Sequence, residues 1–134
     1  TVYREQYKPS EQRPQPHAIL ALHVVAADTE AEAERLASSV DLNFARRRQG
    51  HYAPIPSPEE AAAHSYSPSD RALIAQNRAR LVVGDKRKVM AHVEPLLEAT
   101  KADEVMITTM IYDHEARKHS YELMAEAFGL SPRV

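Results

Sequence analysis

The sequence predicts an α/β fold built on parallel strands, and three observations favour it. Two apolar runs, residues 18–26 and 105–111, are separated by segments with helical periodicity, the arrangement of a strand–helix–strand unit. The first run is apolar on both faces, as in a buried parallel strand. Only 3 glycines accompany 9 prolines, whereas a small antiparallel protein needs more glycine for its turns. Because two parallel strands cannot cover both of their faces, we expect a part of a larger α/β sheet or barrel.

The first eight residues are typical of the last turns of a helix. Tyr3 and Tyr7 are four positions apart and share one helical face, and Pro9 ends the pattern. Neither an initiator methionine nor an N-terminal cap precedes this helix. The chain therefore begins within an element, which predicts a fragment or a processed product.

The strand over 18–26 leads directly into a helix. Thr29 at the N-cap and Glu32 three residues later form the pattern of a capping box. The residues that follow at helical spacing predict one buried face: Ala33, Leu36, Ala37 and Val40.

Residues 41–84 read as a helical insertion between the two strands. The pattern Ser-Pro-x-acid occurs twice, beginning at Ser57 and at Ser67. In each copy the serine caps a helix, the proline takes the first helical position and the acid lies in the first turn. The two copies predict helices over 58–64 and 68–80, after a loop over 50–58.

Gly84 and Asp85 predict the start of another helix, and Pro95 should kink this helix or restart it. The second strand follows it. Asp113 predicts the N-cap of the last helix, which ends at Gly129. This helix should bury Ala116, Leu123, Met124, Ala127 and Phe128.

Polar residues gather where the second strand ends. They are Thr108, Thr109, Tyr112, Asp113 and His114. Ligands of parallel α/β proteins bind at the carboxyl ends of the strands, so these five residues are the candidate binding site. A structural interpretation stays open beside it, because Asp113 suffices as a helix cap and Thr108 can satisfy hydrogen bonds inside a barrel.

Composition disfavours several other functions. The chain has 17 Lys and Arg against 19 Asp and Glu, a net charge of −2, and its one basic cluster is Arg46–Arg48, so nothing indicates a nucleic acid or an anionic membrane as partner. The absence of cysteine excludes disulfides and thiolate metal sites and agrees with a cytoplasmic location. His114 and His119 are five positions apart rather than the four of a helical zinc motif, so no metal site is expected.

Three stretches resemble the luciferase-like flavin-dependent monooxygenases, the bacterial luciferase superfamily. They are YREQYKPSEQ from Tyr3, HVVAADTEAEAERLA from His23, and VVGDKRKV followed by ADEVMITTMIYDHEARKHSYELMAEAFGL. The resemblance covers nearly the whole chain and keeps the order of the elements. The chain is similar only to the C-terminal portion of the proteins in that family.

The resemblance implies a C-terminal slice of a (β/α)₈ TIM barrel rather than a complete barrel. Residues 18–26 and 105–111 would be its last two strands, and residues 1–134 would form a single segment with the insertion at 41–84. It also implies an enzyme that uses reduced FMN and oxygen to oxidise a small organic substrate. Thr108, Thr109, Tyr112, Asp113 and His114 would then contact the flavin, although most of the flavin site would lie in the strands absent from this chain.

Two other hypotheses remain. The isolated chain could be a non-catalytic homo-oligomer, because exposed strand edges and apolar faces need cover. It could also be a small stand-alone binding module. The sequence does not identify the substrate and does not distinguish FMN from a deazaflavin. It also identifies no catalytic residue.

Overall fold

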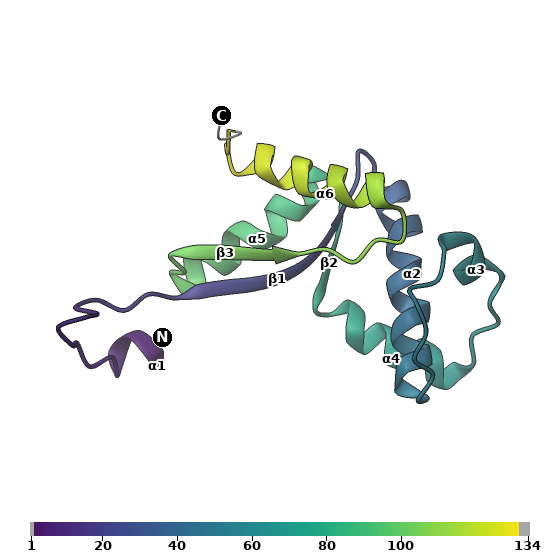
Figure 1. The fold of residues 1–134 in the computed structure, drawn as a ribbon, viewed down its shortest axis with the longest axis horizontal. Helices are drawn as coiled ribbons and strands as arrows, with labels where there is room; N and C mark the ends of the chain where they lie inside the picture. Colours follow the sequence, from purple (N-terminus) through teal and green to yellow (C-terminus); the bar gives the residue numbers. More distant parts are fainter. Residues whose placement is uncertain (1, 132–134) are drawn as a thin grey trace.

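A computed structural model describes residues 2–131 of the chain. The elements follow one another as α1 (Val2–Glu5), β1 (Ile19–Ala26), α2 (Glu30–Arg48), α3 (Pro58–Ala63), α4 (Pro68–Arg78), β2 (Leu81–Gly84), α5 (Lys86–Thr100), β3 (Glu104–Thr108) and α6 (His114–Ala127). Figure 1 shows the three strands at the centre, with α5 and α6 beside them and α2, α3 and α4 grouped at one end. The predicted α/β class is confirmed.

The sheet has the order β2-β1-β3, and both pairings are parallel. The two halves of the central strand β1 pair with different neighbours. Ile19 to His23 pairs with β3, and His23 to Ala26 pairs with β2 on the other edge. The expected parallel pairing of the first and last strands is confirmed, and the described residues form an open sheet rather than a closed barrel.

The prediction of only two strands was wrong, because residues 81–84 form β2. This strand lies inside the segment expected to be a helical insertion, and α2 also extends eight residues into that segment. A run of four residues is too short to show a strand period, so the local pattern around Gly84 predicts only a helix start. In the structure Gly84 ends the strand beside Ala26, and an added Cβ would lie 2.7 Å from the side chain of Lys88.

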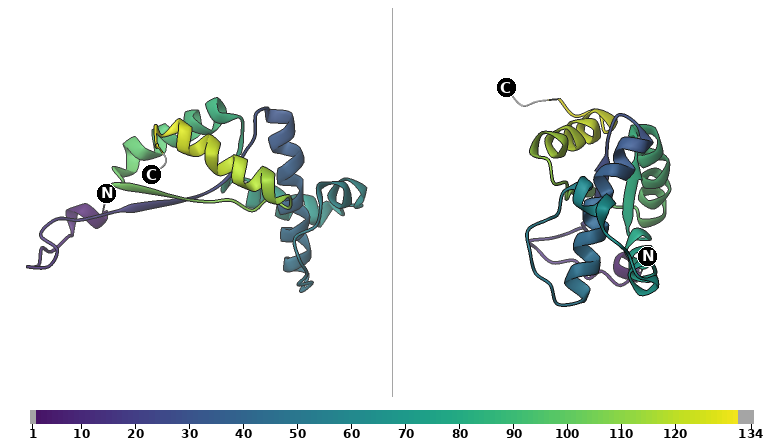
Figure 2. Two further views of the ribbon diagram at one scale, coloured as in Figure 1. Left: turned by 45° about the horizontal axis from the view of Figure 1, so that its top comes forward. Right: turned by 90° about the vertical axis from the view of Figure 1, so that its right-hand side faces the viewer.

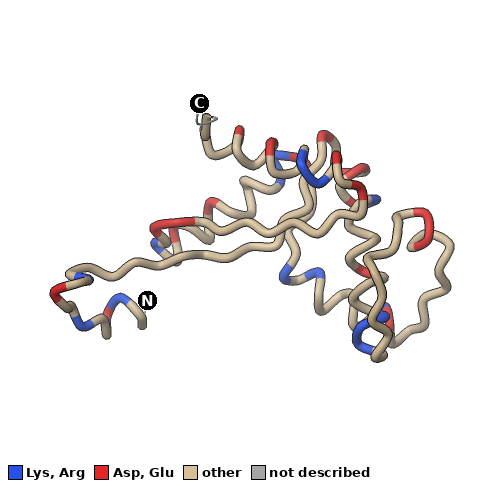
Figure 3. Tube along the Cα trace, in the orientation of Figure 1, with Lys and Arg blue, Asp and Glu red and all other residues tan. Residues whose placement is uncertain are grey.

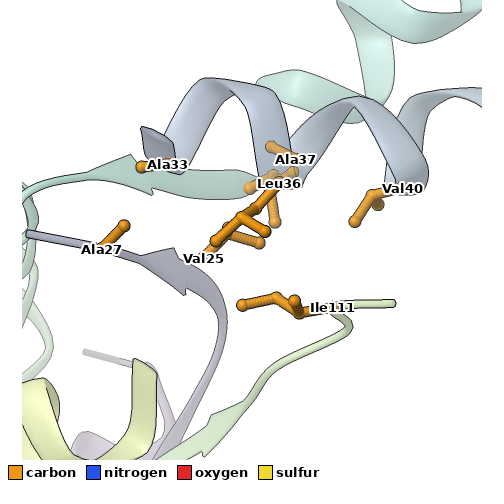
Figure 4. Packing of buried hydrophobic residues seen from close by; sticks show 8 residues of the cluster. Val25, Ala27, Ala33, Leu36, Ala37, Val40 and Ile111 are labelled. Atoms are coloured by element: carbon orange, nitrogen blue, oxygen red, sulfur yellow. The ribbon is translucent and has the colours of Figure 1, made fainter. Parts of the chain in front are cut away.

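Helices cover the sheet from both sides (Figures 1 and 2). On one side α2 packs Leu36, Ala37 and Val40 against Val25, and Ile111 closes this cluster from the segment after β3 (Figure 4). On the other side α5 and α6 cover the remaining sheet residues. That second cluster comprises Val24, Ala26, Val82, Val89, Val93, Leu123 and Met124.

The predicted helix starts are confirmed at Ser57, Ser67, Asp85 and Asp113, each of which accepts a hydrogen bond from the third residue of its helix. Thr29 caps α2 in the same way, but the reciprocal half of the predicted capping box is replaced. The Glu32 carboxylate binds Arg35 at 2.8 Å. A guanidinium is the stronger partner for an exposed carboxylate, because both groups are charged.

Two other predictions need correction. Helix α5 continues through Pro95 to Thr100 instead of restarting there. Proline costs one backbone hydrogen bond, but this helix is held on both sides of Pro95 by the packing of Val89, Val93 and Leu97. The last strand ends at Thr108 rather than at residue 111, and the chain then turns to bring Ile111 under α2.

Candidate functional site

The face of the sheet toward α2 is covered over only half of its length. Parallel partners point to the same side, so Ala21 and Met106 share this face, as do His23 and Thr108. Helix α2 covers Val25 at the end of β1 and leaves the first half of the strand bare. We name the uncovered part the open face, and it consists of Ile19, Ala21, His23, Glu104, Met106 and Thr108.

The open face is apolar for most of its length. Ile19 and Met106 are 50% and 52% exposed, although both belong to strands at the centre of the fold. No Lys or Arg occurs in β1 or β3, and the only acid in either strand is Glu104 at the beginning of β3 (Figure 3). This surface therefore suits a flat, uncharged partner better than an anionic group.

The open face becomes polar where β3 ends. His23 lies opposite Thr108 in the strand register, so the two side chains stand at the same level. The Thr108 hydroxyl lies 3.4 Å from the Leu22 carbonyl oxygen and remains exposed. The Nε2 atom of His23 is buried without a hydrogen-bond partner among the described residues. Burial lowers the pKa of His23, so the imidazole is neutral at pH 7.

Thr109 joins the end of β1 to α6. Its hydroxyl donates to the Val24 carbonyl and lies 3.3 Å from the Ser120 hydroxyl. Ser120 is buried and accepts a hydrogen bond from the Ala26 amide at 3.0 Å. The backbone amide of Thr109 donates to the Tyr121 hydroxyl at 3.1 Å. Both polar groups of Thr109 therefore hold α6 on the sheet.

The other three predicted site residues lie in the exposed segment that leads into α6. Tyr112 is 54% exposed. Asp113 accepts a hydrogen bond from the Ala116 amide at 2.8 Å and so acts as the predicted helix cap. His114 accepts from Arg117 through Nδ1 at 2.8 Å. The structure thus brings Thr108 to His23 and Thr109 to Ser120, but it does not gather the five predicted residues around one point.

Two residues near the strand ends, His23 and Ser120, were not among the candidate site residues of the sequence. His23 counts as mid-strand when β1 is read alone, and only the register with β3 shows that it lies level with a strand end. Ser120 had a signal, because it falls four positions after Ala116 within the apolar stripe of α6. A polar residue in such a stripe predicts a buried hydrogen bond.

Charged side chains near the strand ends form ion pairs rather than a metal site. His119 at Nε2 lies 2.9 Å from Asp28 and at Nδ1 3.3 Å from Glu122, and these hydrogen bonds raise the pKa of His119. Within residues 2–131 no group of three or more His, Asp and Glu side chains is placed to hold a metal ion. No helix in the described part of the chain is long and apolar enough to cross a membrane.

A groove of about 630 Å³ lies on the opposite side of β3, between α5 and α6. Its walls are mainly apolar and include Val105, Ile107, Met124 and Phe128. These residues belong to or adjoin the packing of the two helices on the sheet. The groove is separated by the sheet from His23 and Thr108, so it is not part of the open face.

Known proteins resemble this chain over nearly its whole length. It is 36% identical over 122 residues to a luciferase-like monooxygenase of Escherichia coli strain K12, which is 91% of this chain and 36% of that protein. It is 40% identical over 127 residues to the uncharacterized protein YceB of Bacillus subtilis strain 168, which is 95% of this chain and 38% of YceB. No protein-family model matches the chain.

A solved structure has the same arrangement of elements. The crystal structure of apo-MsnO8 superposes with a TM-score of 0.82 and 32% identity, over 98% of this chain and 41% of that one. The chain thus spans about two fifths of the length of the relatives it matches. The comparisons support the luciferase-like monooxygenase family for this region.

Proposed function

We propose that this chain is the C-terminal part of a luciferase-like, flavin-dependent monooxygenase that uses reduced flavin and oxygen to oxidise a small organic substrate. The similarity to the E. coli monooxygenase over 91% of the chain carries the proposal. In this proposal β1 and β3 are the last two strands of a (β/α)₈ barrel, and α3 and α4 belong to an insertion between them. The isolated chain is then inactive, because the relatives are more than twice as long.

The open face supports the proposal because it has the character of a cofactor-binding surface. Ligand sites are mostly apolar with a few polar groups that fix orientation. Ile19, Ala21 and Met106 supply the apolar part, and His23 and Thr108 supply the polar groups. The absence of Lys and Arg from β1 and β3 fits a flavin ring rather than a flavin phosphate.

A bound flavin would supply the redox chemistry with oxygen. The residues of this chain would orient the ring and exclude water from one side of it. The apolar side chains of the open face would pack against the ring, and His23 and Thr108 would meet its polar edge. Tyr112, Asp113 and His114 follow β3 and would lie at the rim, while Thr109 would hold α6 in place behind the site.

Titration of flavins against two polypeptides tests the proposal. Oxidised FMN, FAD and a deazaflavin would each be added to the 134-residue chain and to the longer polypeptide that the proposal requires, with flavin fluorescence as the readout. We expect binding by the longer polypeptide alone, and oxygen uptake when that protein is supplied with reduced flavin. A longer polypeptide that neither binds flavin nor consumes oxygen would refute the proposal.

A further inference from the structure

A second hollow lies away from the open face, among the helices α2, α3 and α4 that Figure 1 shows grouped at one end of the molecule. Its volume of about 600 Å³ is within the range of small-molecule sites. Ser38 and Asp41 line it from α2. The same helix packs Ala37 and Val40 toward the sheet, so α2 stands between the sheet and this space, which we name the three-helix hollow.

Apolar side chains form much of the wall of the three-helix hollow. Ile74 and Ala75 line it from α4, and Arg71 lies one turn earlier on the same face of that helix. Ala61 contributes from α3 and is buried. The small and aliphatic side chains leave room for the carbon skeleton of a ligand, and removing such a skeleton from water is favourable.

Two aromatic rings stand together in the segment between α3 and α4. The rings of His64 and Tyr66 meet edge to face, with their centroids 4.8 Å apart. The Tyr66 hydroxyl donates to the Ala61 carbonyl oxygen at 3.2 Å, which fixes this ring. Among residues 2–131 the ring nitrogens of His64 have no hydrogen-bond partner. The pair therefore supplies a fixed flat wall and a polar group that can bind a ligand.

Arg71 brings a guanidinium to the hollow without a carboxylate partner in the described part of the chain. Its Cζ atom lies 6.0 Å from the centre of the Tyr66 ring. The neighbouring Asp70 accepts hydrogen bonds from two other side chains. Both carboxylate oxygens of Asp41 accept from Arg78. The hollow thus presents one available positive charge, while the acids beside it are already bound.

We propose that the three-helix hollow binds a small organic monocarboxylate, with the carboxylate on Arg71 and His64 and the carbon skeleton between the ring pair and the apolar face of α4. A guanidinium fork matches the two oxygens of a carboxylate. One positive charge suits a singly charged acid better than a phosphate dianion, and the apolar wall suits its skeleton. Such a site goes beyond the proposed function, because α2 separates it from the sheet and no flavin takes part.

Calorimetric titration of the full-length protein with benzoate tests the site, because benzoate joins one carboxylate to a flat apolar skeleton. Benzyl alcohol keeps the skeleton without the charge, and inorganic phosphate keeps a charge without the skeleton. Arg71→Gln removes the cation, and Ala75→Phe fills the hollow from an exposed position on α4. Arg87→Gln is the matched control, because Arg87 is exposed on α5 and does not line the hollow.

We expect benzoate to bind the wild type with a dissociation constant below about 1 mM. Arg71→Gln should weaken it by about tenfold through loss of a charge-assisted hydrogen bond. Ala75→Phe should abolish binding, and Arg87→Gln should bind as the wild type does. Both control ligands should bind more weakly than benzoate.

Three results would overturn the inference: no benzoate binding by the wild type, wild-type affinity in both Arg71→Gln and Ala75→Phe, or phosphate binding as tight as that of benzoate. Melting temperatures of the variants, followed in parallel, show whether each is folded. Flavin titration of the same proteins reads out the proposed function separately, since neither Arg71 nor Ala75 belongs to the open face. Either conclusion can therefore fail while the other stands.

Discussion

The hydrogen bonds of Thr109 show that this residue at a strand end has a structural role. The sequence places Thr108 and Thr109 together at the mouth of the last strand. In the structure the Thr109 hydroxyl bonds to the Val24 carbonyl and contacts Ser120, whereas the exposed Thr108 hydroxyl makes only a long hydrogen bond, 3.4 Å, to the Leu22 carbonyl. Alternation along an extended chain sends neighbouring side chains to opposite sides, so two adjacent threonines meet different surroundings.

Replacing Thr109 by valine should therefore destabilise the fold. The variant keeps the shape of the side chain and removes the hydroxyl that joins the end of β1 to α6. We expect the free energy of unfolding in urea to fall by about 1–2 kcal/mol. Thr108→Val is the control and should change it by less than about 0.5 kcal/mol. Equal losses in both variants would contradict the structural role of Thr109.

Two histidines should give opposite dependences of stability on pH. Burial lowers the pKa of His23 below the ordinary value of 6.5. The unfolded chain then binds the proton more readily, so the contribution of His23 is present above pH 6.5 and is lost as the pH falls toward its folded pKa. The hydrogen bonds with Asp28 and Glu122 raise the pKa of His119, so its contribution is present below pH 6.5 and is lost as the pH rises through its folded pKa.

Unfolding free energies measured between pH 5 and pH 8 test the direction of both pH dependences. Subtracting the curve of His23→Gln from that of the wild type should leave a difference that grows with pH. Subtracting the curve of His119→Gln should leave one that declines with pH. Differences that change with pH in the same direction would show that the environment of one of the two histidines is described wrongly.

At the scale of elements, an ion pair connects α2 and α4. The guanidinium of Arg78 donates through Nε and Nη2 to the two carboxylate oxygens of Asp41, each at 2.8 Å, and through Nη1 to Glu34 at 3.0 Å. Burial raises the pKa of Asp41, and Arg78 opposes that shift. The side chain of Asp41 is 13% exposed, so its carboxylate needs this partner.

Arg78→Met should destabilise the protein by about 1–3 kcal/mol, because the Asp41 carboxylate would stay largely buried without its bidentate donor. Arg35→Met is the matched control, since Arg35 pairs with Glu32 and Glu59 on an exposed surface. Urea denaturation of both variants measures the difference. A loss in the control as large as that in Arg78→Met would mean that burial of Asp41 contributes nothing.

Helix α5 contains a conflict between local preference and tertiary packing. Pro95 lies on the exposed side of a helix that continues to Thr100. Pro95→Ala restores the missing amide and removes the ring from the preceding turn. We expect stabilisation by about 1–3 kcal/mol in thermal or urea unfolding. Glu94→Ala, an exposed neighbour, should change stability little, and no gain in Pro95→Ala would indicate that the proline is accommodated without strain.

At the scale of the whole molecule, the open face remains without cover. Exposed apolar side chains on a central strand favour association, and the outer edges of β2 and β3 have no partner strand among the described residues. We expect the 134-residue chain alone to form homo-oligomers through this face.

A charge on the open face should suppress that association. Ile19→Lys and Met106→Lys place an ammonium group on it, and both positions are about half exposed, so the fold can accept lysine there. Sedimentation velocity should show a lower mass for each variant than for the wild type. Tyr52→Lys, at a 77% exposed position outside the sheet, is the control. A wild type that sediments as a monomer would refute the expectation.

The sequence by itself determined the features that depend on neighbours along the chain. The caps at Ser57, Ser67, Asp85 and Asp113 and the stripe of α6 follow from local hydrogen bonding and from helical periodicity. The first strand was also predictable, because eight residues show their apolar character clearly.

Tertiary structure decided the features that depend on how strands lie beside one another. Strand β2 has only four residues and is stabilised by pairing with His23 to Ala26 and by the packing of Leu81 and Val82. The local sequence pattern contains neither of these interactions. The register between β1 and β3 put His23 level with Thr108 and separated Thr109 from it. Local signals cannot set that register, since the free energy of pairing comes from residues more than eighty positions apart.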